Sequence, residues 1–163
     1  MRDCRFIAEH RGGLLPRESH ACLARWASDC AETVIRFFEV QSDDPRPREA
    51  IATGRRWANG EIKTGVAMKA SVAAHAAARS ATDPSAIAAA RAAAHAVATA
   101  HASDHCMGAL LYVMKALDAV GMDSLAEFDR QIEKLPEFLR DQVASGVSAR
   151  VPRLSVPKSK RVR

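Results

Sequence analysis

The alanine content between residues 67 and 102 constrains the fold of this chain more than any other feature. Nineteen of these 36 residues are alanine. Alanine has the highest helix propensity and the smallest side chain that still buries apolar surface, so helices built from it can approach each other closely. Aromatic residues make up only 5% of the chain, which argues against a sheet built on aromatic and β-branched side chains. We therefore expect an all-α protein.

Apolar residues recur at spacings of three and four along most of the sequence, a pattern typical of amphipathic helices. The first four predicted helices cover 16–39, a shorter span from the loop SDDPRP to about Ala58, 61–81 and 85–101. A fifth helix follows an apolar stripe that ends at Gly121, a sixth opens at the capping box SLAE at 124–127, and the last covers 136–149. Asp43 or Asp44 is the expected cap of the second helix. Ser103 and Asp104 either cap a new helix or lie within a continued one. We expect six or seven helices in one bundle or stacked array.

The charge of +5 is concentrated at the C-terminal end of the chain. Residues 150–163 carry six bases and no acid, whereas residues 1–149 carry 18 bases and 19 acids. A basic end with two prolines is typical of a solvated, disordered tail, and less often of an arm that binds nucleic acid. With a length that favours one core, the chain divides into an N-terminal segment (1–15), a helical domain (16–149) and a basic tail (150–163).

The cysteines and the N-terminus indicate a reducing compartment. Cys4, Cys22, Cys30 and Cys106 form no CxxC pair, and the start MRDCRFIAEHRGG carries charges where a secretory signal needs an apolar run. We therefore expect a cytoplasmic protein with free thiols. No segment approaches the 18 or so uncharged apolar residues that a membrane span requires, so we expect no membrane association.

The stretch RPREAIATGRRWANGE, residues 46–61, combines four arginines with a predicted helix. In one interpretation Arg48 or Arg55 forks onto a carboxylate of the first helix, Asp29 or Glu32, and is structural. In the other, the arginines form a cationic patch for an acidic partner or ligand; its members would be Arg46, Arg48, Arg55 and Arg56. Both can hold, and we expect Arg48 or Arg55 to point inward and Arg56 outward.

Two tryptophans and a methionine-bearing stripe are expected in the core. Trp57 should close the core beside Trp26. The stripe consists of Met107, Leu110, Leu111 and Met114. If one apolar face of the array were left open instead, the protein would form a homodimer.

The histidines raise the possibility of a polar or metal site. His75 and His95 occur in similar alanine settings on consecutive helices, so their rings can face a common polar pocket, with Glu61 as a hydrogen-bond partner. His101 and His105 could share one zinc ion if a helix runs continuously through them. The segment HASDH lacks the glutamate of a zinc protease motif, and no spacing fixes a third ligand. We therefore favour half-buried core histidines and expect no metal and no cofactor.

No nucleophile and base are paired by spacing, and no glycine-rich phosphate loop is present in the sequence. The chain contains, in this order, the blocks HACLARWASDCAETVIRFFE, DPRPREAIATGRRWANGE, AAHAAARS, ARAAAHAVATAHASDH and LLYVMKAL. Over residues 20–117 it thereby resembles a bacterial family of small all-helical proteins described as putative immunity proteins, the immunity-five-like group of polymorphic toxin systems. The resemblance implies a cytoplasmic, non-enzymatic protein that neutralises a toxin by binding it, and it carries over no catalytic residue.

Two alternative functions remain open from the sequence. The first is a small helical enzyme or metal protein that uses the central histidines, with Arg48 or Arg55 orienting an anionic substrate. Its histidines would be His75, His95, His101 and His105. The second is a nucleic-acid-associated protein, in which the basic tail neutralises phosphates.

Overall fold

The computed structural model describes residues 3–151, and in this part of the chain the all-α expectation is confirmed. Two short 3₁₀ helices, η1 (Cys4–Phe6) and η2 (Glu9–Arg11), precede eight α-helices. These are α1 (Arg17–Glu32), α2 (Arg36–Glu39), α3 (Arg46–Ala58), α4 (Thr64–Ser80), α5 (Pro84–Ala98), α6 (His105–Ala119), α7 (Ser124–Glu133) and α8 (Glu137–Arg150). An isolated β-bridge joins Ala8 and Leu15. Most of the basic tail, residues 152–163, lies outside the described residues.

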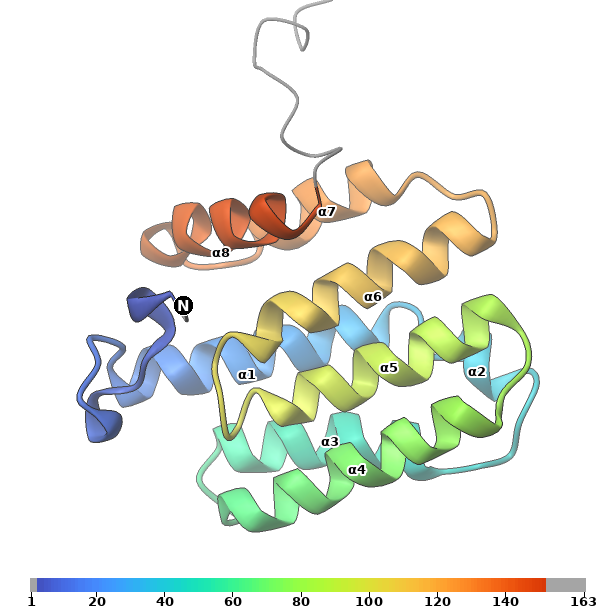
Figure 1. Cartoon of the computed structure of the whole chain (residues 1–163), viewed down its shortest axis with the longest axis horizontal. Coiled ribbons are helices and arrows are strands. Elements are labelled where there is room, and N and C mark those ends of the chain that lie inside the picture. The colour runs from blue at the N-terminus through green and yellow to red at the C-terminus, as the bar shows by residue number, and fades with distance from the viewer. Residues whose placement is uncertain (1–2, 152–163) are drawn as a thin grey trace, which may run out of the picture.

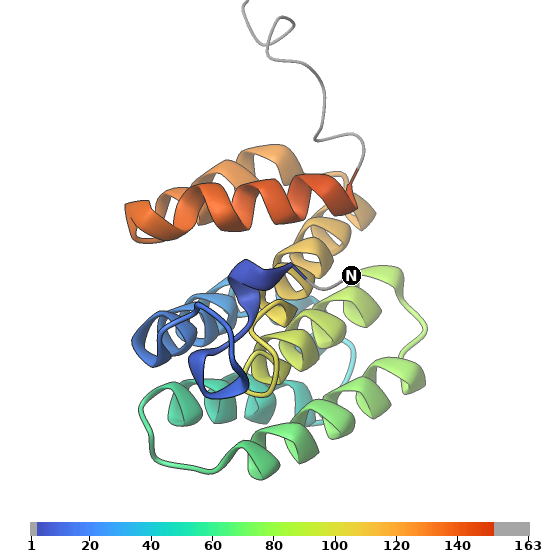
Figure 2. The same ribbon diagram turned by 60° about the vertical axis from the view of Figure 1, so that its left-hand side comes forward.

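Helix α5 occupies the centre of the array (Figure 1). It packs against α1, α2, α3, α4 and α6, while α7 and α8 pack against α6 and against each other. Seen from the second direction, α7 and α8 form an outer layer on one side and α3 and α4 lie on the other (Figure 2). Among residues 3–151, none of the helices combines the length and the apolar character that crossing a membrane would require.

The alanine-rich sequence of α5 explains its central position. Eleven of its fifteen residues are buried, and all but two of these eleven are alanine. A helix that is apolar all round must be covered on every side, and small side chains let its neighbours approach closely. The Ser71 hydroxyl of α4 donates a hydrogen bond to the Ala94 carbonyl of α5 at 3.0 Å. Side chains therefore reach directly to the backbone of the neighbouring helix.

Buried polar contacts connect α1 to α7. The indole N–H of Trp26, which is 5% exposed, donates to the Gln131 carbonyl at 2.8 Å. The Gln131 side chain is fully buried; its oxygen accepts from the Cys30 thiol at 3.4 Å and its amide donates to Glu127 at 2.5 Å. These bonds satisfy polar groups that would otherwise be costly to bury. Trp26 is a core residue, as the sequence indicated.

The N-terminal segment packs onto the helical array. Phe6 and Leu15 are 2% and 3% exposed. The Ser103 hydroxyl donates to the Phe6 carbonyl at 2.6 Å, and the Gln142 amide donates to the Arg5 carbonyl at 2.9 Å. Residues 3–15 therefore contribute to the same core as the helices.

The first predicted helix is interrupted by a turn at residues 33–35. The Thr33 hydroxyl and backbone N–H both donate to the Cys30 carbonyl, at 2.7 and 3.1 Å, so the chain bonds three residues back instead of four. Thr33, Val34 and Ile35 form a β-branched run, which lowers helix propensity. Val34 and Ile35 stay buried across the turn. The apolar spacing therefore persists although the helix does not.

Several predicted ends and faces also need correction. The predicted capping box SLAE does not open α7, because the preceding Asp123 is the N-cap and accepts from the N–H groups of Leu125 and Ala126. Phe138 belongs to the predicted last helix but is 71% exposed. Neither candidate cap is the N-cap of α3: this residue is Pro45, and Asp44 just before it accepts the backbone N–H of Arg46 at 3.0 Å.

The turn predicted at NG is present, since Gly60 has a φ of +76°, a conformation that favours glycine. Of the two possibilities at Ser103 and Asp104, a new helix is the one observed. Residues 99–104 form a turn between α5 and α6.

Candidate functional site

The arginines of α3 form ion pairs with carboxylates of α1 and α2. Arg48 forks onto Glu39, with Nε–Oε1 and Nη2–Oε2 distances of 2.6 and 2.9 Å, and also pairs with Glu32. Arg55 donates to Asp29 Oδ1 at 2.8 and 3.2 Å and to Glu32 Oε2 at 3.0 Å. The predicted pairing with Asp29 and Glu32 is confirmed, and Glu39 is an additional partner. Glu32 bridges the two arginines, so this seam fixes α3 against α1.

The other two arginines of the stretch 46–56 are also paired with carboxylates. Arg46 pairs with Asp44 at 2.6 Å, and Arg56 lies 3.5 Å from Glu61. The four arginines of 46–56 therefore share five carboxylates among the described residues; these are Asp29, Glu32, Glu39, Asp44 and Glu61. The hydrogen bond from Arg48 lowers the pKa of Glu39, and the one from Arg46 lowers the pKa of Asp44. Within the described residues, carboxylates of the chain itself therefore compensate the positive charges of the four arginines.

The orientation of these arginines follows the expected division. The Arg55 side chain, which pairs with carboxylates of α1, is 37% exposed, whereas the Arg56 side chain is 57% exposed. Glu61 was expected beside the central histidines. Instead its carboxylate pairs with Arg56 and accepts from the Asn59 amide at 3.2 Å.

Four histidines line up between α4, α5 and α6. The rings of His75 and His95 lie 5.3 Å apart in an edge-to-face arrangement, which confirms that these two residues face each other. His95 also stacks on Tyr112 at 5.1 Å and lies 5.3 Å from His105. His105 in turn lies 4.9 Å from His101. The result is a row of aromatic rings in which each is in contact with the next.

Burial keeps the centre of this row neutral. Burial lowers the pKa of His95 to about 4, and the neighbouring His105 and His75 add to the shift. Burial also lowers the pKa of His75, assisted by Arg91. The Nδ1 atoms of His95 and His105 are 3.2 Å apart, so one ring donates its proton to the other. These contacts describe a polar packing seam.

The row does not have the geometry that the zinc hypothesis required. His101 lies in the turn between α5 and α6, and His105 is the first residue of α6, so no continuous helix carries both. Within residues 3–151, no three or more histidine, cysteine or carboxylate side chains are grouped so that they could hold a metal ion. Nδ1 of His101 is buried without a hydrogen-bond partner.

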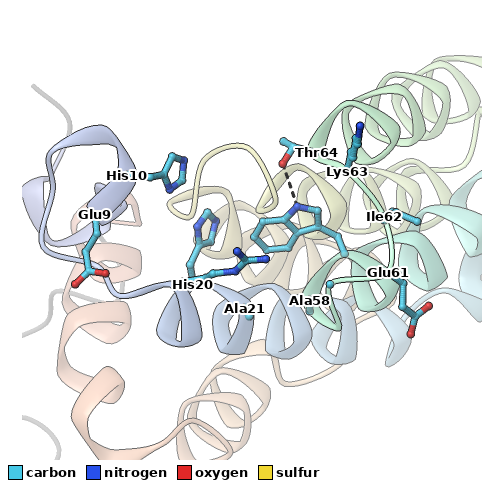
Figure 3. Close-up of a pocket in the computed structure, with 12 residues that line it drawn as sticks. Glu9, His10, His20, Ala21, Ala58, Glu61, Ile62, Lys63 and Thr64 are labelled. Carbon is cyan, nitrogen blue, oxygen red and sulfur yellow. Dashed lines mark hydrogen bonds between the residues drawn. The ribbon is translucent and has the colours of Figure 1, made fainter.

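A cleft of about 780 Å³ opens at the end of the array where the N-terminal segment meets the start of α1 and the loop between α3 and α4 (Figure 3). Glu9 and His10 come from the N-terminal segment, and His20 and Ala21 come from α1. The remaining lining residues are Arg17, Trp57, Ala58, Gly60, Glu61, Ile62, Lys63 and Thr64. A cleft of this size is typical of small-molecule sites.

Two aromatic rings form part of the cleft wall. The rings of His20 and Trp57 lie 4.9 Å apart and are tilted by 56°. The indole N–H of Trp57 donates to the Thr64 hydroxyl at 3.0 Å, the bond drawn as a dashed line in Figure 3. Nε2 of His20 lies 2.6 Å from the Thr99 carbonyl and donates to it. Trp57 therefore packs against His20 and against the edge of the core, and unlike Trp26 it is only half-buried.

His20 was not among the residues singled out from the sequence. It is 4% exposed, and burial is the main cause that lowers its pKa, so the ring is neutral at pH 7. Its contacts come from Trp57, 37 positions away, and Thr99, 79 positions away. No spacing rule connects such distant positions, so the sequence held no signal that would have identified the cleft.

Large apolar side chains are also exposed on the outer face of α4. Val66, Met68 and Val72 are 48%, 47% and 67% exposed. They lie on a helix whose other faces pack against α3 and α5.

One comparison with known proteins gives a match. The model of a family described as "Imm-5 like putative immunity protein" matches residues 13–138, a span from the N-terminal segment to the start of α8. The chain matches no curated protein and no solved structure.

Proposed function

Because the chain belongs to the family of Imm-5 like putative immunity proteins, we propose that it is a non-enzymatic binding protein that neutralises a toxin by direct protein contact. The family match carries this proposal, since it covers α1 to α7 and the start of α8. The four cysteines are unpaired, which agrees with action in the reducing environment of a bacterial cytoplasm.

The architecture suits a binding protein that keeps its shape. The α3 arginines are ion-paired across helices, and the central helix is covered on several sides. A rigid surface loses little conformational entropy when it binds, so more of its contact energy appears as affinity.

The proposed contact residues include the half-exposed charges of the α3 seam. These are Arg46, Arg48, Arg55, Arg56 and Glu61, all paired within the chain. A partner that meets them faces alternating charges and must match that pattern, which favours specificity over general attraction to acidic surfaces. His75 and His95 complete the set of candidates, and they would act by holding α4 against α5.

Co-expression with a toxin encoded directly beside this chain's gene is the decisive experiment. We expect growth to be rescued by the wild-type chain and a stable complex to elute together in size-exclusion chromatography. The Arg56→Gln and Glu61→Gln double variant should weaken the complex. Arg79→Gln, which removes an exposed charge elsewhere, is the matched control. A toxin that is neither bound nor neutralised by the wild-type chain contradicts the proposal.

The oligomeric state of the free protein should also be measured by light scattering. A second copy of the chain is an alternative partner for the exposed apolar side chains of α4, which are Val66, Met68 and Val72. A stable dimer that dissociates when the toxin is added would show that both partners use the same surface.

A further inference from the structure

Two cationic side chains at the cleft differ from the arginines of α3 in having no carboxylate partner among the described residues. Arg17 and Lys63 line the cleft, and neither side chain forms an ion pair or hydrogen bond within residues 3–151. By contrast, Arg48 and Arg55 are each held by two carboxylates. The cleft therefore presents two cations that the described residues leave without an ion pair.

Two helix N-termini add to this positive potential. The sixteen-residue α1 begins at Arg17, and the seventeen-residue α4 begins at Thr64, both of which line the cleft. Neither N-cap residue, Pro16 or Lys63, makes a side-chain capping bond. The first amides of a helix have no intrahelical acceptor, and the helix dipole makes this end attractive to anions.

His20 contributes a hydrogen-bond acceptor to the cleft. The residue is 4% exposed and lines the cleft. Because Nε2 donates its proton to the Thr99 carbonyl, the neutral ring leaves Nδ1 as an acceptor. Nδ1 has no hydrogen-bond partner within the described residues and is not fully enclosed, so it can accept a hydrogen bond from a donor in the cleft.

The half-buried ring of Trp57 lies beside His20 and offers an apolar face to a flat group. Glu9 and Glu61 also line the cleft, and Glu61 is already paired with Arg56. Their negative charge disfavours polyanions and restricts the cleft to a ligand with one anionic group.

We propose that this cleft binds a small ligand whose single oxyanion, a carboxylate or phosphate, is carried by a flat group that also donates a hydrogen bond. The oxyanion lies between Arg17, Lys63 and the two helix N-termini. The flat group packs on Trp57 and donates to Nδ1 of His20. This site is a property of the chain alone and does not depend on toxin binding.

NMR titration of the ¹⁵N-labelled full chain tests the proposal. The probes are 4-hydroxybenzoate, which carries a carboxylate, and adenosine 5′-monophosphate, which carries a phosphate. Their matched uncharged counterparts are 4-hydroxybenzamide and adenosine. We expect at least one anionic probe to shift the Trp57 indole N–H and the amides of Arg17 and Thr64 in a saturable way. The Trp26 indole, buried against Gln131, should not move.

Which probe binds distinguishes the two sources of the oxyanion, and binding of either supports the site. Arg17→Gln and Lys63→Gln should each weaken binding about tenfold, since each removes a charge-assisted contact. Arg79→Gln removes another exposed charge, which has no ion pair within residues 3–151 and lies near the far end of α4, and should leave binding unchanged. The same spectra show whether each variant is folded.

Three results would overturn the proposal. One is the absence of saturable shifts with both anionic probes up to about 10 mM, a concentration at which a dissociation constant of a few millimolar would still be detected. Another is equal affinity for the uncharged counterparts. The third is an equal loss of affinity in the Arg79→Gln control.

Discussion

The close packing of α1 and α3 can be tested at a single glycine. Gly54 is buried, and a Cβ atom placed on it would lie 2.7 Å from the Ser28 hydroxyl oxygen of α1. The next nearest atoms, Cα and Cβ of Val97 in α5, would lie at 3.5 and 3.8 Å, which is ordinary contact. The hydroxyl oxygen of Ser28 is therefore the one atom that a methyl group at Gly54 would clash with. Ser28 is fully buried, and its hydroxyl donates to the Ala24 carbonyl at 2.9 Å.

This geometry sets the expected energies. Gly54→Ala should gain about 1 kcal/mol from helix propensity and lose about 1–3 kcal/mol from overpacking, so the net destabilisation is about 0–2 kcal/mol. Ser28→Ala removes a hydrogen bond to the Ala24 carbonyl, which also accepts a backbone hydrogen bond of the helix. The substitution should change the free energy of unfolding by less than about 1 kcal/mol. The double variant relieves the clash and keeps the propensity gain. It should therefore be more stable than Gly54→Ala by about 1–3 kcal/mol.

Urea unfolding followed by circular dichroism at 222 nm measures all four proteins of this double-mutant cycle, and equal m-values would show that the unfolded states are comparable. Two outcomes would refute the reasoning. In the first, Gly54→Ala is more stable than the wild type by the full propensity gain of about 1 kcal/mol, so α1 and α3 have room for a methyl group. In the second, Ser28→Ala fails to restore the stability of Gly54→Ala, so the strain lies elsewhere.

Three further predictions follow from the charges and the core. Burial lowers the pKa of His95 from 6.5 to about 4, so between these values the unfolded chain binds a proton that the folded chain does not. The free energy of unfolding should therefore fall by up to about 3 kcal/mol as the pH drops from 6.5 to 4, and His95→Gln should lose most of this slope in urea titrations; an unchanged slope would assign it to other groups. Glu32→Gln breaks two half-exposed ion pairs and should cost no more than about 1 kcal/mol, with the loss largest at low salt and nearly absent at 1 M salt; a loss that persists in salt would contradict a surface seam. Phe38→Ala should cost about 3–5 kcal/mol because the ring is 2% exposed, whereas Phe138→Ala, at 71% exposure, should change stability by less than about 0.5 kcal/mol in thermal or urea unfolding. Similar losses at both positions would show that Phe138 is not exposed in solution.

The helical array could be predicted because alanine restricts both conformation and packing. A run such as PSAIAAARAAAHAVA favours a helix at nearly every position, and it can bury its apolar surface only by being covered on most sides, as α5 is. The turn at 33–35 escaped prediction because Val34 and Ile35 remain buried within the turn itself. Apolar spacing reports which residues are buried, and it is less sensitive to whether the backbone bonds three or four residues back.

The paired residues of the site could be predicted only where two regular elements face each other. Arg48 or Arg55 was matched to Asp29 or Glu32 because both helices were predicted to be amphipathic, and the pairing of Arg55 with both carboxylates is confirmed. His75 and His95 were matched because they occur in similar alanine settings on consecutive helices. Their contacts beyond that pair depend on where α6 begins, which the sequence left open at Ser103 and Asp104.

The position of the cleft follows from the close approach of helices that are lined by small side chains. Helices lined by small residues close together and leave little space between them: a Cβ on Gly108 of α6 would lie 2.6 Å from Nδ1 of His95 in α5. Space remains where the chain leaves these helices and larger side chains meet at irregular angles. Trp57 lies at the end of α3 and Lys63 lies just before the start of α4, so both belong to such a region. The histidine row is therefore a place where rings fill a seam, and the end of the array is the place where a ligand can enter.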